Sequence, residues 1–424
     1  MSEKKIVTLE PKVIESIISR GWDKAPPLTA HSYNQQTSLN LHWILRPFGP
    51  QDDTFLITNH QPLPTVYCLL PTNNYIYRMS RISEQEALDL FLNAPLDELC
   101  ARANAEKEAR HGKSVYWVNN RQINYTNVCV LHCKFCAFSR IKKDSPTAYD
   151  WNYETIRNKA AEAIGNGARE LHIVGGLHPD HPFDYYIEML RKLRKEFPSV
   201  NLKAFTAVEI CHFAKISGQS PEQIMATLKD AGLDALPGGG AEILVQSVRD
   251  KICPGKETGE EWLAVHRAAH KLGIPTNATM LFGHIEKIED RIAHMKMLRD
   301  LQDEAPGFFA FIPLVYHPEH NALHQIVPNI TSEEDILRTV AVSRLFMDNF
   351  PHIKAYWIQM GIETAMKALH AGASDLDGTI VEEKITHAAG ATVPVGMSPE
   401  RMKSLIIKEG LVPVERDALY ERFS

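Results

Sequence analysis

The chain has 424 residues, of which 44% are hydrophobic and 23% charged, and its formal net charge is −6 at pH 7. This length accommodates one large domain or two ordinary ones, and this composition is that of a globular protein in water. Because no long basic run is present, the sequence argues against nucleic acid and membrane surfaces as partners.

Signals for export are also missing from the sequence. The N-terminal Met-Ser-Glu-Lys-Lys is followed by no uninterrupted apolar segment, and no stretch approaches the length of a membrane span. Seven cysteines, an odd number without an export signal, favour a reducing compartment in which disulfides are rare. We therefore expect a cytoplasmic protein.

Residues 1–82 differ from the rest of the chain. Proline-rich turns such as Ala25-Pro-Pro-Leu28 separate short apolar runs, among them Phe55-Leu-Ile-Thr58 and the run from Thr65 to Leu70. Runs of this length between turn signals predict strands. Since the segment carries no chemical motif, we interpret it as an accessory region that docks or caps.

Helical signals begin at Ser83. The tetrapeptide Ser83-Glu-Gln-Glu86 is a capping box, and a second helix is expected from Leu96 to His111. A strand over Gln122–Thr126 then leads into a cysteine-rich loop. Further helix starts are predicted from cap signals at Asp184, Ser220-Pro221, Thr331–Glu334 and Ser398-Pro399.

Beyond the loop, short apolar runs alternate with amphipathic helical patterns. The predicted strands are Glu170–Val174, Asn201–Val208, Leu233–Leu236, Thr276–Leu281, Phe308–Val315 and Ile353–Ile358, with an eighth position near Gly378–Val381. Such alternation is typical of an α/β fold with a parallel sheet. We expect residues 83–424 to form a TIM-type (β/α) barrel, full or partial, with a C-terminal helical extension. A doubly wound open sheet is the alternative, although no G-x-G-x-x-G follows the first strand.

The cysteine-rich loop is the strongest chemical signal. Cys129, Cys133 and Cys136 have the spacing C-x3-C-x2-C, and Phe135 precedes the last of them. Thiolates are the ligands of iron–sulfur clusters and zinc. Because a four-iron cluster usually takes four protein thiolates, three cysteines leave one iron open to another ligand.

Half of a zinc site is the alternative for this loop, since Cys133 and Cys136 alone form a C-x2-C pair. A zinc ribbon needs a second close pair of cysteines. The other cysteines are scattered singly, at positions 68, 100, 211 and 253.

The ends of the predicted strands carry further candidates, because active sites of (β/α) barrels lie at the C-terminal ends of the strands. Gly175 and Gly176 follow one strand and allow the backbone to approach a ligand closely. Glu209 follows the next strand as a hydrogen-bond acceptor, or alternatively as a capping residue. Three glycines at 238–240, beside Glu242, fit a backbone that lines a pocket.

The cysteine spacing with its aromatic residue resembles the cluster motif of the radical S-adenosylmethionine (SAM) enzymes. The Gly175-Gly176 pair is similar to their GGE motif, with Leu177 in place of the glutamate. The resemblance implies a [4Fe-4S] cluster on Cys129, Cys133 and Cys136, with SAM chelated to the open iron. The residues that it places at SAM are Phe135, Gly175, Gly176, Glu209 and Met280.

From Ser83 to Tyr420 the chain resembles the aminofutalosine synthase family within these enzymes. The residues that carry the resemblance are Cys129–Phe138, His172–Pro179, Phe205–Ile210, Leu236–Ile243, Ala278–His284, Phe311–Leu314 and Asp377–His387. The last segment discriminates, because relatives tend to have Glu-Glu-Asn where this chain has Glu382-Glu383-Lys384. The cyclase and deazaflavin (FO) synthase relatives remain the alternative, and a non-catalytic zinc-binding protein is a third.

The resemblance implies that the 5′-deoxyadenosyl radical from SAM adds to 3-[(1-carboxyvinyl)oxy]benzoate, with loss of CO2 or bicarbonate. SAM is then a co-substrate, the other substrate is a small dicarboxylate, and an electron donor such as flavodoxin or ferredoxin is required. We name Glu242, His284 and His317 as candidate substrate contacts. The available basic residues are Arg267, Arg344, Lys354 and the two histidines.

Overall fold

The computed structural model describes residues 44–47, 55–58 and 81–423. The chain divides into two compact units, residues 1–80 and 81–424. In the first unit, strands β1 (Ile44–Pro47) and β2 (Phe55–Thr58) form an antiparallel pair. Strand β2 confirms the predicted strand at Phe55, whereas the run from Thr65 lies outside the described residues. The accessory role of this region stays a prediction.

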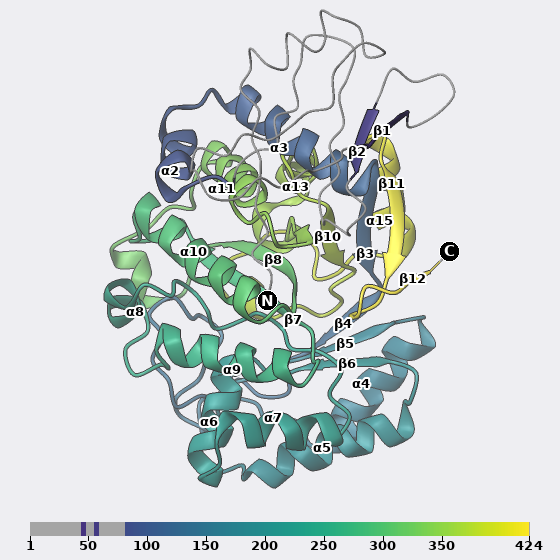
Figure 1. Cartoon of the computed structure of the whole chain (residues 1–424). Coiled ribbons are helices and arrows are strands. Elements are labelled where there is room, and N and C mark those ends of the chain that lie inside the picture. The colour runs from purple at the N-terminus through teal and green to yellow at the C-terminus, as the bar shows by residue number, and fades with distance from the viewer. Residues whose placement is uncertain (1–43, 48–54, 59–80, 424) are drawn as a thin grey trace, which may run out of the picture. The chain divides into compact units, whose positions relative to one another are not determined.

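The second unit is built on parallel strands (Figure 1). One sheet contains β4 (Asn120–Ile123), β5 (Glu170–Ile173) and β6 (Asn201–Ala204). A second contains β7 (Thr276–Phe282), β8 (Phe308–Val315) and β9 (His352–Ile353). Each strand is followed by helix before the next begins, which is the order that the apolar runs predicted.

Single parallel bridges close the gaps between these sheets into a ring. The bridged pairs are Lys203 with Ala235, Leu236 with Thr276, Lys354 with Asp375, and Arg121 with Val381. Residues 235–236 therefore take the fourth position of the ring, and β10 (Asp375–Gly378) with the residues after it takes the eighth. The structure confirms a (β/α) barrel, closed all the way round, and the open-sheet alternative is wrong.

Two predicted strands are too long, because helices begin within them. The strand from Asn201 ends at Ala204, where Thr206 caps α6 (Ala207–Ser217) and Glu209 completes a capping box. The strand predicted over Ile353–Ile358 ends at Ile353, and α12 (Trp357–Met360) follows. In both cases local hydrogen bonding of the turn overrides the β propensity of the apolar residues.

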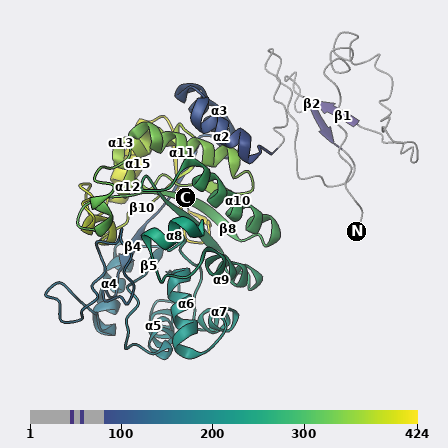
Figure 2. The same ribbon diagram turned by 90° about the vertical axis from the view of Figure 1, so that its left-hand side faces the viewer.

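Helices surround the strands (Figure 2). The principal ones are α4 (Tyr153–Gly165), α5 (Phe183–Glu196), α7 (Pro221–Asp230), α9 (Gly259–Lys271), α10 (Ile288–Glu304), α11 (Glu333–Phe346) and α13 (Ile362–Leu369). Shorter ones are α8 (Gln246–Ile252), the 3-10 helix η2 (Ala322–Gln325) and α14 (Ile385–Ala388). In α5 the buried stripe contains Ile187, Leu190 and Leu193. Each such side chain stabilises the barrel by about 1.5–3 kcal/mol.

Most predicted helix caps are confirmed. Ser83 forms its capping box at α2 (Glu84–Asn93), which α3 (Leu96–His111) follows, and Ser220 caps α7 ahead of Pro221. Two predictions are wrong. The residue before α5 is Pro182 and not Asp184, and α11 is capped by Ser332, whose hydroxyl accepts from the Asp335 amide at 3.2 Å.

The C-terminal region is only partly the predicted helical extension. Ser398 caps α15 (Pro399–Lys408) as expected, but β11 (Val412–Arg416) and β12 (Arg422–Phe423) follow. Strand β11 pairs in parallel with β3 (Ser114–Val118), which in turn pairs with β10. Arg416 and Asp375, both fully buried, form an ion pair of 2.6 Å beside the barrel. Among the described residues, no helix is long and apolar enough to cross a membrane.

Candidate active site

A cavity of about 320 Å³ runs from the cysteine-rich loop into the barrel. Its wall combines loop residues with side chains of the strands. Of the residues predicted from sequence, those on its wall are Cys129, Cys133, Cys136, Phe135, Gly175, Gly176, Glu209, Glu242 and His317. Segments that lie far apart in the sequence therefore meet at one place, as the barrel prediction required.

The three cysteines are free thiols that share this wall. Backbone amides point at two of the sulfurs, Leu131 N at 3.5 Å from Cys129 Sγ and Ser139 N at 3.4 Å from Cys136 Sγ. Such donors stabilise a thiolate and tune a bound cluster. Burial raises the pKa of the Cys133 thiol, so a metal must displace its proton on binding.

The glycine pair after β5 forms a turn that is packed against the cysteine loop. A Cβ on Gly176 would lie 2.3 Å from the carbonyl oxygen of Val128, and one on Gly175 would lie 2.7 Å from the Tyr125 ring. Gly176 N also donates to Thr126 O at 2.9 Å. Only glycine fits at either position, so the backbone of the turn itself faces the cavity.

Glu209 supports this turn. Its Oε1 accepts from the Tyr125 hydroxyl at 2.7 Å and from Gly175 N at 3.2 Å. Its Oε2 accepts from the Thr206 amide at 2.7 Å and from the Thr206 hydroxyl at 2.9 Å. Burial raises the pKa of this carboxyl to about 7. Four protein donors therefore fill the acceptor positions of Glu209. Glu209 caps helix α6, which was the alternative interpretation of this residue, and it also positions the glycine turn.

Glu242 faces the cavity as predicted, but as half of an ion pair. Lys256 Nζ donates to its Oε1 at 2.5 Å, and both side chains are nearly buried. The ammonium group lies 5.6 Å from the centre of the Phe135 ring. Glu242 also has φ +47°, an uncommon conformation for a residue other than glycine that persists only where surrounding contacts hold it. Lys256 was not predicted from the sequence.

Of the two predicted histidines, only His317 lines the cavity. Its Nε2 contacts Gln359 O at 2.9 Å, and burial lowers its pKa. The side chain of His284 is fully buried elsewhere, with Nδ1 2.9 Å from Glu286 and Nε2 3.0 Å from Leu281 O. His284 is therefore a structural residue, and its prediction as a substrate contact is wrong.

Met280 is also misassigned. It is fully buried in strand β7 and is absent from the cavity wall, whereas its neighbours Thr279 and Leu281 are on it. Side chains alternate along a strand, so the residues on either side of Met280 point into the barrel while Met280 points outward. Of the residues that the resemblance placed at SAM, Met280 is therefore the one that does not reach the cavity.

The two arginines and the lysine named from the sequence are not on the cavity wall. Arg267 lies on α9 and pairs with Glu304 at 2.8 Å. Arg344 is buried in α11 and donates to Gly372 O at 2.9 Å. Lys354 pairs with Asp377 at 2.9 Å, and of these two only Asp377 is on the wall.

Sequence reasoning missed the polar end of the cavity, which we call the floor. Its side chains come one from each of four strands: Gln122, His172, Lys203 and Asn277. The available signal was alternation. Lys203 lies between the apolar Leu202 and Ala204, and a charged residue in that pattern points into the barrel.

The segment that discriminates between the relatives, Asp377–His387, contributes Asp377, Glu383, Ile385 and Thr386 to the cavity wall. Asp377, Ile380 and Glu382 all have positive φ, which is rare for side chains of these types. Glu383 lines the cavity, and its Oε2 lies 2.7 Å from His387 Nδ1. Lys384 points away from the cavity wall, over the Trp151 ring at 4.8 Å.

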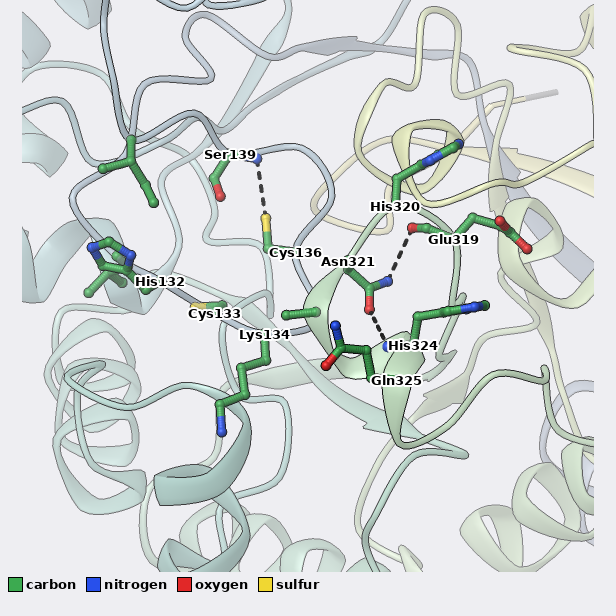
Figure 3. Close-up of a pocket in the computed structure, with 13 residues that line it drawn as sticks. His132, Cys133, Lys134, Cys136, Ser139, Glu319, His320, Asn321, His324 and Gln325 are labelled. Carbon is green, nitrogen blue, oxygen red and sulfur yellow. Dashed lines mark hydrogen bonds between the residues drawn. The ribbon is translucent and has the colours of Figure 1, made fainter.

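A second hollow, of about 650 Å³, lies against Cys133 and Cys136 (Figure 3). Its wall consists of residues from the 131–141 and 319–325 segments. Asn321 orders the second segment, accepting from the His324 amide at 3.2 Å and donating to Glu319 O at 3.2 Å. The hollow includes neither the glycine turn nor the floor, so we assign the site to the first cavity.

Comparisons with known proteins agree with this geometry. Residues 123–298 match the Radical SAM superfamily, and residues 305–424 match the CofH/MqnC C-terminal region. Aminodeoxyfutalosine synthase of Thermus thermophilus is 44% identical over 83% of this chain and 95% of that protein. The 5-amino-6-(D-ribitylamino)uracil–L-tyrosine 4-hydroxyphenyl transferase of Methanopyrus kandleri is 41% identical, over 80% and 93%. Cyclic dehypoxanthine futalosine synthase of Streptomyces coelicolor is 39% identical, over 80% and 85%.

Solved structures resemble the fold. Methylornithine synthase (PylB) has a TM-score of 0.63 at 16% identity, covering 78% of this chain and 94% of that chain. The [FeFe]-hydrogenase maturase HydG has a TM-score of 0.62 at 16% identity, covering 79% and 73%.

The site fits the cofactors of the matched superfamily, a [4Fe-4S] cluster and SAM. Three free thiols on one wall, with amides aimed at two sulfurs, suit a cluster that keeps one iron open. The glycine turn beside them leaves backbone groups accessible to SAM. A zinc ribbon does not fit, because the other free cysteines of the described residues, Cys100, Cys211 and Cys253, are not on this wall.

Proposed function

We propose that this chain, which belongs to the radical SAM superfamily and ends in a CofH/MqnC C-terminal region, makes 6-amino-6-deoxyfutalosine. In this reaction the adenosyl group of SAM joins 3-[(1-carboxyvinyl)oxy]benzoate, methionine leaves, and one carboxylate is lost as CO2 or bicarbonate. The observation that carries the proposal is one cavity that joins the three cysteines and the glycine turn to a cationic, amide-rich floor. The similarity to aminodeoxyfutalosine synthase supports it.

The chemistry divides between cofactor and chain. When bound, the cluster supplies the electron that cleaves SAM into methionine and a 5′-deoxyadenosyl radical. The chain binds, orients and shields. Apolar wall residues Leu281, Leu314 and Val315 offer no hydrogen-bonding groups to water, and the barrel wall brings the reacting carbon and the alkene into one cavity.

An electron donor such as flavodoxin or ferredoxin is part of the proposal. Two of the predicted cluster ligands, Cys133 and Cys136, border the second hollow as well as the cavity (Figure 3). A cluster held by these two residues would be reached by an electron donor from the hollow between the 131–141 and 319–325 segments.

Anaerobic turnover with SAM labelled in its adenosyl group tests the proposal. The cluster-loaded enzyme is expected to transfer the label to a product of the enol ether, with methionine released in equal amount. A Cys136→Ala variant, which lacks one predicted cluster ligand, is expected to form no product. Stoichiometric 5′-deoxyadenosine without label in the product would contradict the proposal and favour hydrogen abstraction, the chemistry of the cyclase alternative.

A further inference from the structure

The floor of the cavity is a built polar site. Gln122, His172 and Lys203 are cross-strand partners on β4, β5 and β6, since Gln122 pairs with His172 and His172 with Lys203. Asn277 comes from β7, and all four side chains line the cavity. Gln122, Lys203 and Asn277 are at most 6% exposed. Burying such polar side chains costs free energy unless they form hydrogen bonds.

Their hydrogen-bonding capacity is largely unused. Within residues 81–423, no hydrogen bond is found for the side-chain amides of Gln122 and Asn277 or for the Nε2 of His172, whose Nδ1 lies 3.9 Å from Glu170. Lys203 donates one hydrogen bond, to Glu170 Oε2 at 3.3 Å, although an ammonium group has three donors. Buried polar groups are normally paired, and these face a cavity, so a ligand with hydrogen-bonding groups can satisfy them there.

The charged groups around the floor indicate the sign of the charge that a ligand there should carry. Lys203 is held by Glu170, which is fully buried and also accepts from Asn120 at 3.1 Å. Asp377 is the other carboxylate near the floor, and Lys354 pairs with it at 2.9 Å. Both carboxylates already have cationic partners, whereas two donors of Lys203 and two amide groups remain. The floor therefore suits an acceptor-only anion.

We propose that Gln122, His172, Lys203 and Asn277 bind the ring carboxylate of an aromatic substrate. The identity of that carboxylate rests on the proposed function. The reacting alkene must lie near the cysteines and the glycine turn, which are in the loops after the strands, whereas the four floor residues lie within the strands themselves and thus deeper in the barrel. The carboxylate meta to the enol ether is then the group that reaches the floor, and it stays on the ring through the reaction.

Binding of a probe pair tests the inference without turnover. The probes are 3-hydroxybenzoate and its neutral counterpart 3-hydroxybenzamide, neither of which has an alkene to react. Their dissociation constants are measured by calorimetry on the anaerobic, cluster-loaded enzyme with SAM. We expect the carboxylate to bind at least about tenfold more tightly than the amide, as charge-assisted hydrogen bonds are the stronger ones.

Two matched variants isolate the ammonium group of Lys203. Lys203→Met combined with Glu170→Gln removes the buried pair without leaving an unpaired charge. Glu170→Gln alone keeps the ammonium but removes its carboxylate partner, at an expected cost of about 3–5 kcal/mol of unfolding free energy. The double variant is expected to lose the preference for carboxylate, and the single variant to retain it. A purely structural role for the pair predicts the same behaviour for both variants.

The outcomes separate the two proposals. No preference in the wild type, or a preference that survives in the double variant, would overturn the carboxylate site. Binding with a Lys203-dependent preference would support it even if labelled SAM gave no adenosylated product, in which case only the proposed reaction would fail. Iron content and thermal unfolding of each variant establish that it is folded and loaded.

Discussion

The mouth and the floor of the cavity recognise ligands in different ways. At the mouth, the groups that face the cavity are cysteine thiols and the backbone of the Gly175-Gly176 turn, held by backbone hydrogen bonds. At the floor they are polar side chains, one from each of several strands. The backbone and thiol groups of the mouth suit the cluster and SAM of the matched superfamily. The polar side chains of the floor are the groups to which we propose that the substrate carboxylate binds.

The largest expected effect comes from the mouth. Gly176→Ala would place a Cβ 2.3 Å from Val128 O and 3.1 Å from the Cys129 Cβ, and the carbonyl belongs to the backbone that leads into the cysteine loop. The turn or the loop must shift by about 1 Å, which costs roughly 100-fold in rate when reacting groups are displaced. SAM cleavage by the reconstituted variant measures this.

Gly165 provides the control. It lies in α4, and a Cβ there would meet nothing within 4 Å. Gly165→Ala is expected to leave SAM cleavage unchanged and to stabilise the protein by about 0.5–1 kcal/mol. Equal activity of the two variants would show that the glycine turn does not contact SAM.

The next largest effect is expected at the ion pair between Lys256 and Glu242. Lys256→Met leaves Glu242 as a buried carboxylate without its 2.5 Å partner and is expected to cost about 3–5 kcal/mol of unfolding free energy. Adding Glu242→Gln removes the stranded charge and is expected to restore most of that loss. Urea denaturation of the three proteins measures both steps. If the double variant is as unstable as the single one, the pair contributes through packing and not through charge.

The smallest effect is expected in the Asp377–His387 segment. The hydrogen bond with Glu383 raises the pKa of His387 above 6.5, and His387 Nε2 also lies 2.9 Å from Val393 O. The charged ring therefore stabilises the folded state below pH 6.5, and this stabilisation is lost as the pH rises through the folded pKa. The unfolding free energy of the wild type is expected to exceed that of His387→Asn by about 1 kcal/mol at acidic pH, and this difference is expected to shrink at alkaline pH. A pH-independent difference in thermal unfolding would contradict this.

The residues of the mouth could be predicted from the sequence, whereas those of the floor could not. The cysteine loop, the glycine pair and the cap at Ser83 are contiguous motifs, so they were predicted without knowledge of the fold. The floor is assembled from Gln122, His172, Lys203 and Asn277, and it emerges only when the strands are in register. The predictions for Met280 and His284 were wrong for a related reason. The sequence showed that both residues lie near a strand end, but it did not show the direction in which their side chains point.

Closure of the barrel has a consequence for how the protein is made. The ring is completed where Asn120 meets Ile380, and these residues are 260 positions apart. Contacts of such long range form late, because most of the chain must be present before they can pair. The cysteine loop emerges from the ribosome long before strands β7 to β10, whose residues complete the wall around it. During synthesis its thiols are thus exposed until the later strands have paired, and we expect the nascent chain to be most sensitive to oxidants in that interval.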